Sequence, residues 1–337
     1  MNDFLEQKRK QINAVSIGVS IYDKENIQFY SAGYSNLATK AKVDKNSFYD
    51  IASIGKLFTV AATFMLIERN LLRLNTKVTS ILDDLPSNWD EIKINHLLTH
   101  TSGIKDYTDT KEYWKEMQDD VSKKRILDYI LNEPLQFNTG TEFQYNNTGM
   151  FLLGLVIEKI TNKDYFHFIR SEILEKYQID GIIKTNNREK DDRKIVGYSI
   201  SNNEFSEIEY YSNSGTFSAG GFSAKLNSFM KFERLLFNGD IISKEYVDQI
   251  ITPWIKPNGQ VLVVQNTKIG HGLFLYDLNG IKVVGHGGNI RGFSSVYFRF
   301  LSENIGIILC TNLDNFAEIH SLLFDVYQKY KAERYLC

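Results

Sequence analysis

The chain has 337 residues, of which 43% are apolar and 24% charged, with 39 basic residues against 41 acidic ones. This length indicates one large domain or two interlocked ones, with enough apolar bulk for a core. The formal charge of −2 excludes a globally basic nucleic-acid binder, and 22 Phe with 19 Tyr exclude intrinsic disorder. Two cysteines, Cys310 and Cys337, cannot form a disulfide framework.

Residues 1–15 begin with charge and lack the apolar core of a signal peptide. The longest apolar stretch, 57–67, reaches about half the length of a membrane span. From the sequence as it stands we therefore expect a soluble, cytoplasmic protein with no membrane segment.

Two strands joined by a polar turn are predicted over residues 16–33. A long helix is predicted from 53 to 70, where apolar residues recur at helical spacing. The middle of the chain, about 71–250, is mainly helical in pattern, with examples at 150–160 and 222–236. The final part changes to short strands separated by turns and ends in a helix; these elements are expected at 271–278, 281–286, 293–300, 304–312 and about 316–334.

Strands at both ends of a helical middle predict that the N- and C-terminal segments join in one antiparallel sheet flanked by helices. The fold class is therefore α+β. We assign a single domain to residues 10–335, with a sheet region at 10–60 and 260–335 and a mainly helical region at 61–259. No linker rich in Pro, Gly or Ser divides the chain.

The sharpest local signal is Ser53-Ile54-Gly55-Lys56, at the start of a predicted helix. Positions three apart share a helix face, so the Lys56 ammonium can lie beside the Ser53 hydroxyl. A serine alcohol becomes a good nucleophile only when a neighbouring group accepts its proton. In isolation the same four residues also describe a serine cap followed by a surface lysine.

Two further motifs follow in the chain. Tyr145-Asn146-Asn147 precedes the predicted helix at 150–160, and a phenol beside an ammonium becomes a usable base. His286-Gly287-Gly288-Asn289 ends the predicted strand at 281–286, and glycines at a strand edge let a substrate backbone approach closely. Taken singly, the tyrosine also fits a packed aromatic residue, and the histidine fits a hairpin turn.

Together the three motifs resemble the serine β-lactamase and penicillin-binding-protein superfamily, in particular its class C-like branch of β-lactamases, D-alanyl-D-alanine carboxypeptidases, D-aminopeptidases and esterases. That family's motifs are S-x-x-K, Y-x-N and [K/H]-x-G, and here they occur in order. The resemblance spans about residues 10–330 and implies a β-lactamase-like fold. Supporting stretches are His96–Gly103, Gly140-Thr141, Ala219–Gly221 and Gly292–Ser295.

The resemblance implies a role for each motif residue. Ser53 would be the acylated nucleophile, Lys56 would shuttle its proton, and Tyr145 would act as general base and later as acid. Which of Lys56 and Tyr145 takes the proton is contested among relatives. The backbone N–H groups of Ser53 and Asn289 would form the oxyanion hole. The expected substrate-binding residues are Asn147, His286, Gly288, Asn289 and Arg291.

His286 departs from the lysine that β-lactamases of this branch usually carry at that position. A lysine there is permanently charged, whereas an imidazole is charged only when protonated. This favours a peptidase or esterase over a dedicated β-lactamase. Arg291 fits either a clamp for a substrate carboxylate or a solvated turn residue. His96 and His100 are interpreted as structural.

No other chemistry has support. The sequence contains no phosphate-binding or dinucleotide-binding glycine loop and no HExxH, so we expect no cofactor and no metal. The function predicted is a serine hydrolase of peptide, amide or ester bonds, with β-lactam hydrolysis or binding as an option. Two alternatives stay open: a non-catalytic or slowly turning-over penicillin-recognising sensor module, and an acyltransferase that uses the same acyl-enzyme. Specificity is expected from loops within about 104–135 and 184–217; the oligomeric state is open.

Overall fold

The structure is a computed structural model that describes residues 1–24, 26–185, 193–202, 204–209, 212 and 214–334. The predicted domain end at 335, Cys337 and part of the predicted loop at 184–217 lie outside these residues. The main feature is a nine-stranded antiparallel sheet of order β3-β2-β1-β14-β13-β12-β11-β10-β9. Its strands are β1 Ser16–Asp23, β2 Asn26–Asn36, β3 Ala41–Lys42, β9 Val263–Val264, β10 Thr267–Ile269, β11 Phe274–Leu278, β12 Ile281–Ile290, β13 Phe293–Phe300 and β14 Ile305–Thr311.

The two ends of the chain meet at the centre of this sheet. Strand β1 pairs with β14, so that Val19 lies opposite Leu309 and Ile21 opposite Ile307. Both strands are buried along their whole length, and β-branched residues suit such a position. The predicted α+β fold class, with one sheet built from both termini, is confirmed.

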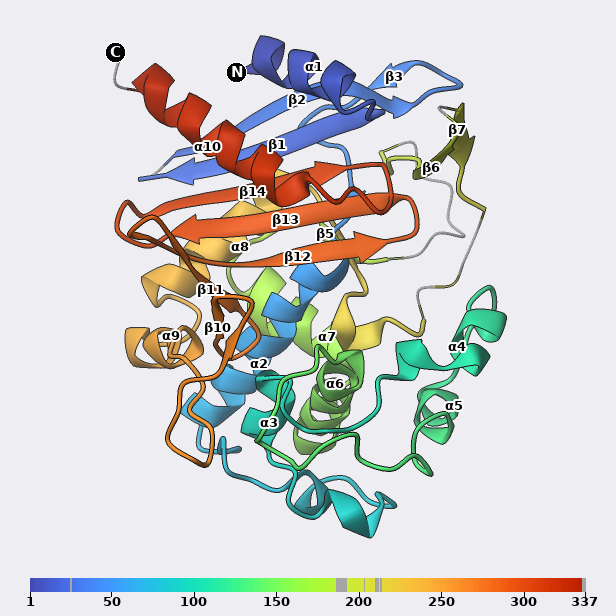
Figure 1. Cartoon of the computed structure of the whole chain (residues 1–337), viewed down its shortest axis with the longest axis vertical. Coiled ribbons are helices and arrows are strands. Elements are labelled where there is room, and N and C mark those ends of the chain that lie inside the picture. Colours follow the sequence, from blue (N-terminus) through green and yellow to red (C-terminus); the bar gives the residue numbers. More distant parts are fainter. Residues whose placement is uncertain (25, 186–192, 203, 210–211, 213, 335–337) are drawn as a thin grey trace.

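Helices cover the sheet on both faces (Figure 1). On the outer face, α1 (Asn2–Gln11) packs on β2, and α10 (Ile319–Arg334) packs on β13 and β14. On the inner face, α8 (Leu226–Asn238) packs on β1 and β14 and connects the sheet to the helical region. The other helices are α2 Lys56–Glu68, α3 Ile94–Leu98, α4 Lys111–Glu116, α5 Lys123–Asp128, α6 Asn147–Thr161, α7 Tyr165–Ile169 and α9 Lys244–Ile250.

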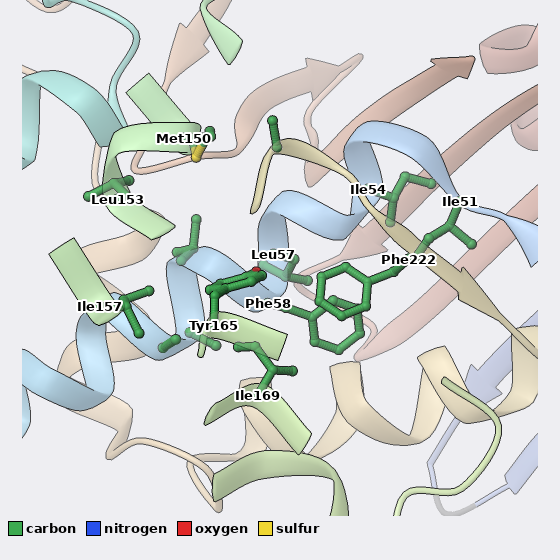
Figure 2. Close-up of a cluster of buried hydrophobic side chains, with 14 of the residues drawn as sticks. Ile51, Ile54, Leu57, Phe58, Met150, Leu153, Ile157, Tyr165, Ile169 and Phe222 are labelled. Atoms are coloured by element: carbon green, nitrogen blue, oxygen red, sulfur yellow. The ribbon is translucent and has the colours of Figure 1, made fainter. Parts of the chain in front are cut away.

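Helix α2 is the centre of the helical region. Its residues from Lys56 to Leu66 are all buried, and a helix that is apolar on every side belongs inside a protein. Figure 2 shows its side chains enclosed by α6 and α7. The Phe58 ring lies 4.7 Å from the Phe222 ring and 4.2 Å from that of Phe232. Such packing fixes the beginning of α2, which is where the S-x-x-K motif lies.

Several predicted element boundaries are wrong in detail. The helix predicted from residue 53 begins as a 3-10 turn at Ala52–Gly55 and becomes α2 only at Lys56. The helix predicted at 222–236 is instead strand β8 (Phe222–Ala224) followed by α8. There the hydrogen bonds of a small sheet override the helical spacing of the sequence: β8 pairs with β4 (Tyr49–Asp50) and β5 (Ile182–Lys184). A separate hairpin consists of β6 (Tyr198–Ser201) and β7 (Glu204–Glu207).

The prediction that the third motif ends its strand is wrong. Strand β12 continues through Gly287, Gly288 and Asn289 to Ile290, and the chain turns only at residues 291 and 292. Gly292 has φ +80°, a conformation that side-chain-bearing residues rarely adopt, so it marks the turn better than the earlier glycines do. Within the described ranges, every helix is too short or too polar to cross a bilayer.

Candidate active site

Ser53 lies in the 3-10 turn that leads into α2, and it lines a cleft between the sheet and the helical region. The preceding Ala52 has φ +48°, an uncommon conformation for a residue with a side chain. Gly220 packs against the same turn, and a Cβ there would lie 2.8 Å from the Ala52 carbonyl oxygen. Close backbone contact therefore holds the turn in this strained shape and presents the serine.

Lys56 is completely buried, and its amine makes three contacts. The Nζ atom lies 2.9 Å from Ser53 Oγ, 2.8 Å from Asn147 Oδ1 and 2.6 Å from the Ala219 carbonyl oxygen. Burial lowers the pKa of Lys56 to about 7, although the nearby Asp106 carboxylate raises it. The Lys56 amine therefore gains or loses its proton near neutral pH, whereas an ordinary lysine does so only at a much higher pH.

Asp106 holds Asn147 in place, and the sequence analysis missed it. Its Oδ2 accepts hydrogen bonds from the Asn147 backbone N–H at 2.5 Å and from the Asn147 side-chain amide at 3.1 Å. Its Oδ1 accepts from Thr108 N at 2.9 Å. An aspartate followed two residues later by threonine is a frequent turn motif, and that was the only signal available. The carboxylate thereby fixes which atom of Asn147 faces Lys56.

Tyr145 lies across the cleft from α2 and is partly buried. Lys56 Nζ is 5.0 Å from the centre of its ring, and the ring packs on that of His100 at 4.8 Å. Burial raises the pKa of the Tyr145 phenol well above its ordinary value, and the Ser53 hydroxyl opposes this shift only in part. The phenol oxygen is buried, and no described residue makes a well-formed hydrogen bond to it. Tyr145 is therefore a neutral phenol at neutral pH.

His286 lies beside Tyr145, with ring centres 5.7 Å apart. Its Nδ1 is 2.5 Å from the Gly287 carbonyl oxygen, which assigns the ring proton to that nitrogen and leaves Nε2 as a buried acceptor without a partner. Burial, aided by the Lys56 charge, lowers the pKa of His286 to about 3. The imidazole is uncharged at neutral pH, so it supplies no positive charge to the cleft.

The end of β12 has a free edge. Strand β11 pairs with β12 only as far as Gly285. Ile290 and Phe293 flank the two-residue turn, so the alternation of antiparallel pairing directs the N–H groups of Gly287 and Asn289 away from β13 and toward this edge. A Cβ on Gly288 would lie 2.7 Å from the Ile51 carbonyl oxygen, which shows how closely β12 approaches the Ser53 turn.

The structure thus brings seven of the eight sequence-predicted residues together around Ser53, and Arg291 stands apart. Arg291 is exposed in the β12–β13 turn, although it also lines the cleft. The cleft encloses about 740 Å³. Its aromatic lining residues are Tyr107, Tyr113, Trp114, Tyr145, Phe274, Tyr276 and Phe316. Among the residues that the structure describes, no cluster of His, Cys, Asp or Glu side chains is suited to a metal ion.

The chain is similar in sequence to two kinds of curated bacterial protein. Penicillin-binding protein 4* of Bacillus subtilis is 27% identical over 305 residues, which cover 86% of this chain and 66% of that protein. Protein flp of Staphylococcus aureus (strain N315) is 31% identical over 180 residues, covering 50% of this chain and 34% of that protein. The chain thus spans about two thirds of the first relative and about a third of the second.

Solved structures share the fold over almost the whole chain. The D-amino acid amidase of Ochrobactrum anthropi SV3, complexed with L-phenylalanine, has a TM-score of 0.84 at 21% identity and covers 99% of this chain and 98% of its own. A penicillin-binding protein of Bacillus halodurans has a TM-score of 0.83 at 22% identity, covering 97% and 100%. A family model described as Beta-lactamase matches residues 1–328. The chain therefore belongs to the Beta-lactamase family and has the serine β-lactamase and penicillin-binding-protein fold.

Proposed function

We propose that the protein is a serine hydrolase that forms an acyl-enzyme at Ser53 with an amide, peptide or ester substrate. The observation that carries the proposal is the contact of 2.9 Å between the buried Lys56 Nζ and Ser53 Oγ, which lines the cleft. A buried amine with a lowered pKa, placed beside an alcohol, is an arrangement that activates the alcohol as a nucleophile.

The contacts of Lys56 favour the amine as the base. A neutral amine has two N–H groups and one lone pair. The carbonyl oxygens of Asn147 and Ala219 can only accept, so they take the two N–H groups. The lone pair is then left for the Ser53 hydroxyl, the one partner that can also donate. Lys56 in its neutral form therefore accepts the proton as Ser53 Oγ attacks the substrate carbonyl carbon.

Tyr145 acts as the acid in this scheme. Its raised pKa keeps the proton on the phenol, so of the two roles that the resemblance implies for Tyr145, general base and later acid, we keep only proton donation. When the tetrahedral intermediate collapses, Tyr145 gives its proton to the leaving nitrogen or oxygen, and Lys56 returns the serine proton to the phenol. His286 Nε2, a buried acceptor beside Tyr145, accepts a hydrogen bond from a substrate N–H.

The backbone supplies the oxyanion hole. The N–H of Ser53 and that of Asn289, on the free edge of β12, both border the cleft. Two such donors stabilise the negative oxygen of a tetrahedral intermediate, and the loss of one donor typically costs about 100- to 1,000-fold in rate.

The substrate proposed is an amide or peptide, with esters as accessible analogues. Solved relatives are named a D-amino acid amidase and a D-stereospecific amidohydrolase, which supports a carbonyl next to a D-configured residue. An uncharged His286 offers nothing to the carboxylate of a β-lactam, and this disfavours a dedicated β-lactamase.

Covalent labelling tests the proposal. Wild-type protein is treated with a fluorophosphonate and separately with a labelled penicillin, and the modified peptide is mapped by mass spectrometry beside Ser53→Ala. A panel of D-amino acid amides, N-acyl-D-alanyl-D-alanine, p-nitrophenyl esters and nitrocefin is then assayed for turnover. We expect an adduct on Ser53 and Ser53-dependent turnover of amides or esters. An adduct that persists in Ser53→Ala overturns the assignment, and labelling without any turnover indicates the sensor module.

A further inference from the structure

A second groove lies on the outer face of the sheet, next to the cleft. Helices α1 and α10 pack on β2, β13 and β14. Strands β11 and β10 follow β12 toward the other edge of the sheet, away from these helix contacts (Figure 1). The groove encloses about 780 Å³ between β10, β11 and the first turns of α10. Phe274, Tyr276 and Leu278 alternate along β11 and contribute to its floor, where each is only partly buried. Half-buried aromatic side chains on one sheet face are typical of a binding surface.

The groove continues directly from the cleft that contains Ser53. Phe274, Tyr276 and His320 line both. A row of neighbouring rings also leads outward from Tyr145: its ring is 5.7 Å from that of His286, and the His286 ring is 5.3 Å from that of Phe274. The row continues from Phe274 to Tyr276 at 6.4 Å. A molecule bound at Ser53 can therefore extend into the groove along one aromatic surface.

The lining is neutral and mainly apolar. Asp277 is its one acidic side chain, and this carboxylate is paired with Lys282. Partial desolvation by its neighbours lowers the pKa of His320, which favours the uncharged imidazole. Phe298 packs between the Tyr276 ring, at 5.2 Å, and the His320 ring, at 5.8 Å. A charged group would lose hydration here without gaining a partner, whereas an alkyl or aryl group would lose nothing.

We propose that this groove binds the leaving group of the substrate, and that the leaving group is a neutral amine or alcohol carrying an alkyl chain or an aromatic ring. The inference rests on the proposed function. In acylation the bond from Ser53 Oγ to the carbonyl carbon forms, the bond from that carbon to the leaving nitrogen or oxygen breaks, and Tyr145 protonates the departing atom. The departing group is thus at the start of the ring row when it is released.

Two ester series separate the groove from the rest of the cleft. In the first, the acyl group is acetyl and the alcohol lengthens from methanol to octanol; in the second, the alcohol is methanol and the acyl chain lengthens. We expect kcat/KM to rise about fourfold per methylene in the first series, by the energy of burying a CH2 group. Ser321→Trp fills the groove from α10, where Ser321 is exposed, and should abolish this rise while leaving the methyl ester unchanged.

The controls make the result decisive. Ser321→Ala should behave like wild type, and Thr267→Trp, on the opposite wall, should repeat the effect of Ser321→Trp. The inference is overturned if rates rise only with acyl length, or if the tryptophan variants slow all alcohols equally. Ser53→Ala is assayed in parallel: hydrolysis that persists in it refutes the proposed function itself, whereas Ser53-dependent hydrolysis without chain-length dependence refutes only the groove.

Discussion

Asp106→Asn tests whether neutral Lys56 is the base. The hydrogen bonds of 2.8 Å and 3.1 Å on the two sides of the Asn147 amide connect the amine to the carboxylate. With the width of the amide group this puts the two charges roughly 7 Å apart. At that distance, and an effective dielectric constant of about 20, the attraction is about 2 kcal/mol, or roughly one to two pKa units.

The sign of the effect follows from the structure. Asp106 raises the pKa of Lys56 against the effect of burial, so removing its charge lowers the pKa further below about 7. If catalysis needs the neutral amine, the acidic limb of the kcat/KM profile follows this pKa. We therefore expect the limb to move to lower pH by about one to two units. The plateau should also fall, because in either orientation the new NH2 group faces donors, those of Asn147 on one side or those of Thr108 on the other.

The assay is kcat/KM for one p-nitrophenyl ester between pH 4 and 9, with stopped-flow pH jumps that avoid prolonged exposure to acid. Thr108→Val is the matched control, because it removes the hydroxyl that donates to Asp106 at 2.8 Å and leaves the charge in place. Its plateau should fall and its acidic limb should stay where it is in wild type. An unmoved limb in Asp106→Asn, or one displaced to higher pH, refutes Lys56 as the base.

Three further predictions follow. Lys56→Met should reduce kcat/KM by about 100- to 10,000-fold, because it removes the proposed base. Tm should not fall, because an apolar chain of similar length replaces a buried amine. A lower Tm would show that the amine is structural. Gly288→Ala should lower both Tm and activity, because the new Cβ would lie 2.7 Å from a backbone oxygen. Gly287→Ala should be milder, because its Cβ would meet only a side chain, at 3.2 Å. Equal effects of the two variants would contradict this reasoning. Arg299→Met should lower the free energy of unfolding, measured in urea, by about 3–5 kcal/mol, because it leaves the buried Glu233 carboxylate without its cation; activity per folded molecule should not change. Adding Glu233→Leu should restore most of the lost stability. If stability does not recover, the ion pair is not the cause of the loss.

The sequence was sufficient for the fold class and the order of the motifs. Strand patterns at both ends of a helical middle predicted that the N- and C-terminal segments would join in one sheet, and in the structure they do so through β1 and β14. Local spacing also placed Ser53 and Lys56 together, because three residues are less than one helical turn. The boundary at β8 was wrong because its pairing with β4 and β5 depends on residues distant in the sequence.

Only the tertiary structure decided the charges in the site and its extent. A pKa depends on burial and on neighbouring groups, and these come from many segments: Asp106 reaches Lys56 through Asn147, and His286 is uncharged because it is enclosed. The outer groove likewise exists because α10 packs on β13 and β14 and leaves β11 partly uncovered. A sequence specifies residue types and local spacing, whereas the energy of a proton or an apolar group depends on everything that surrounds it in space.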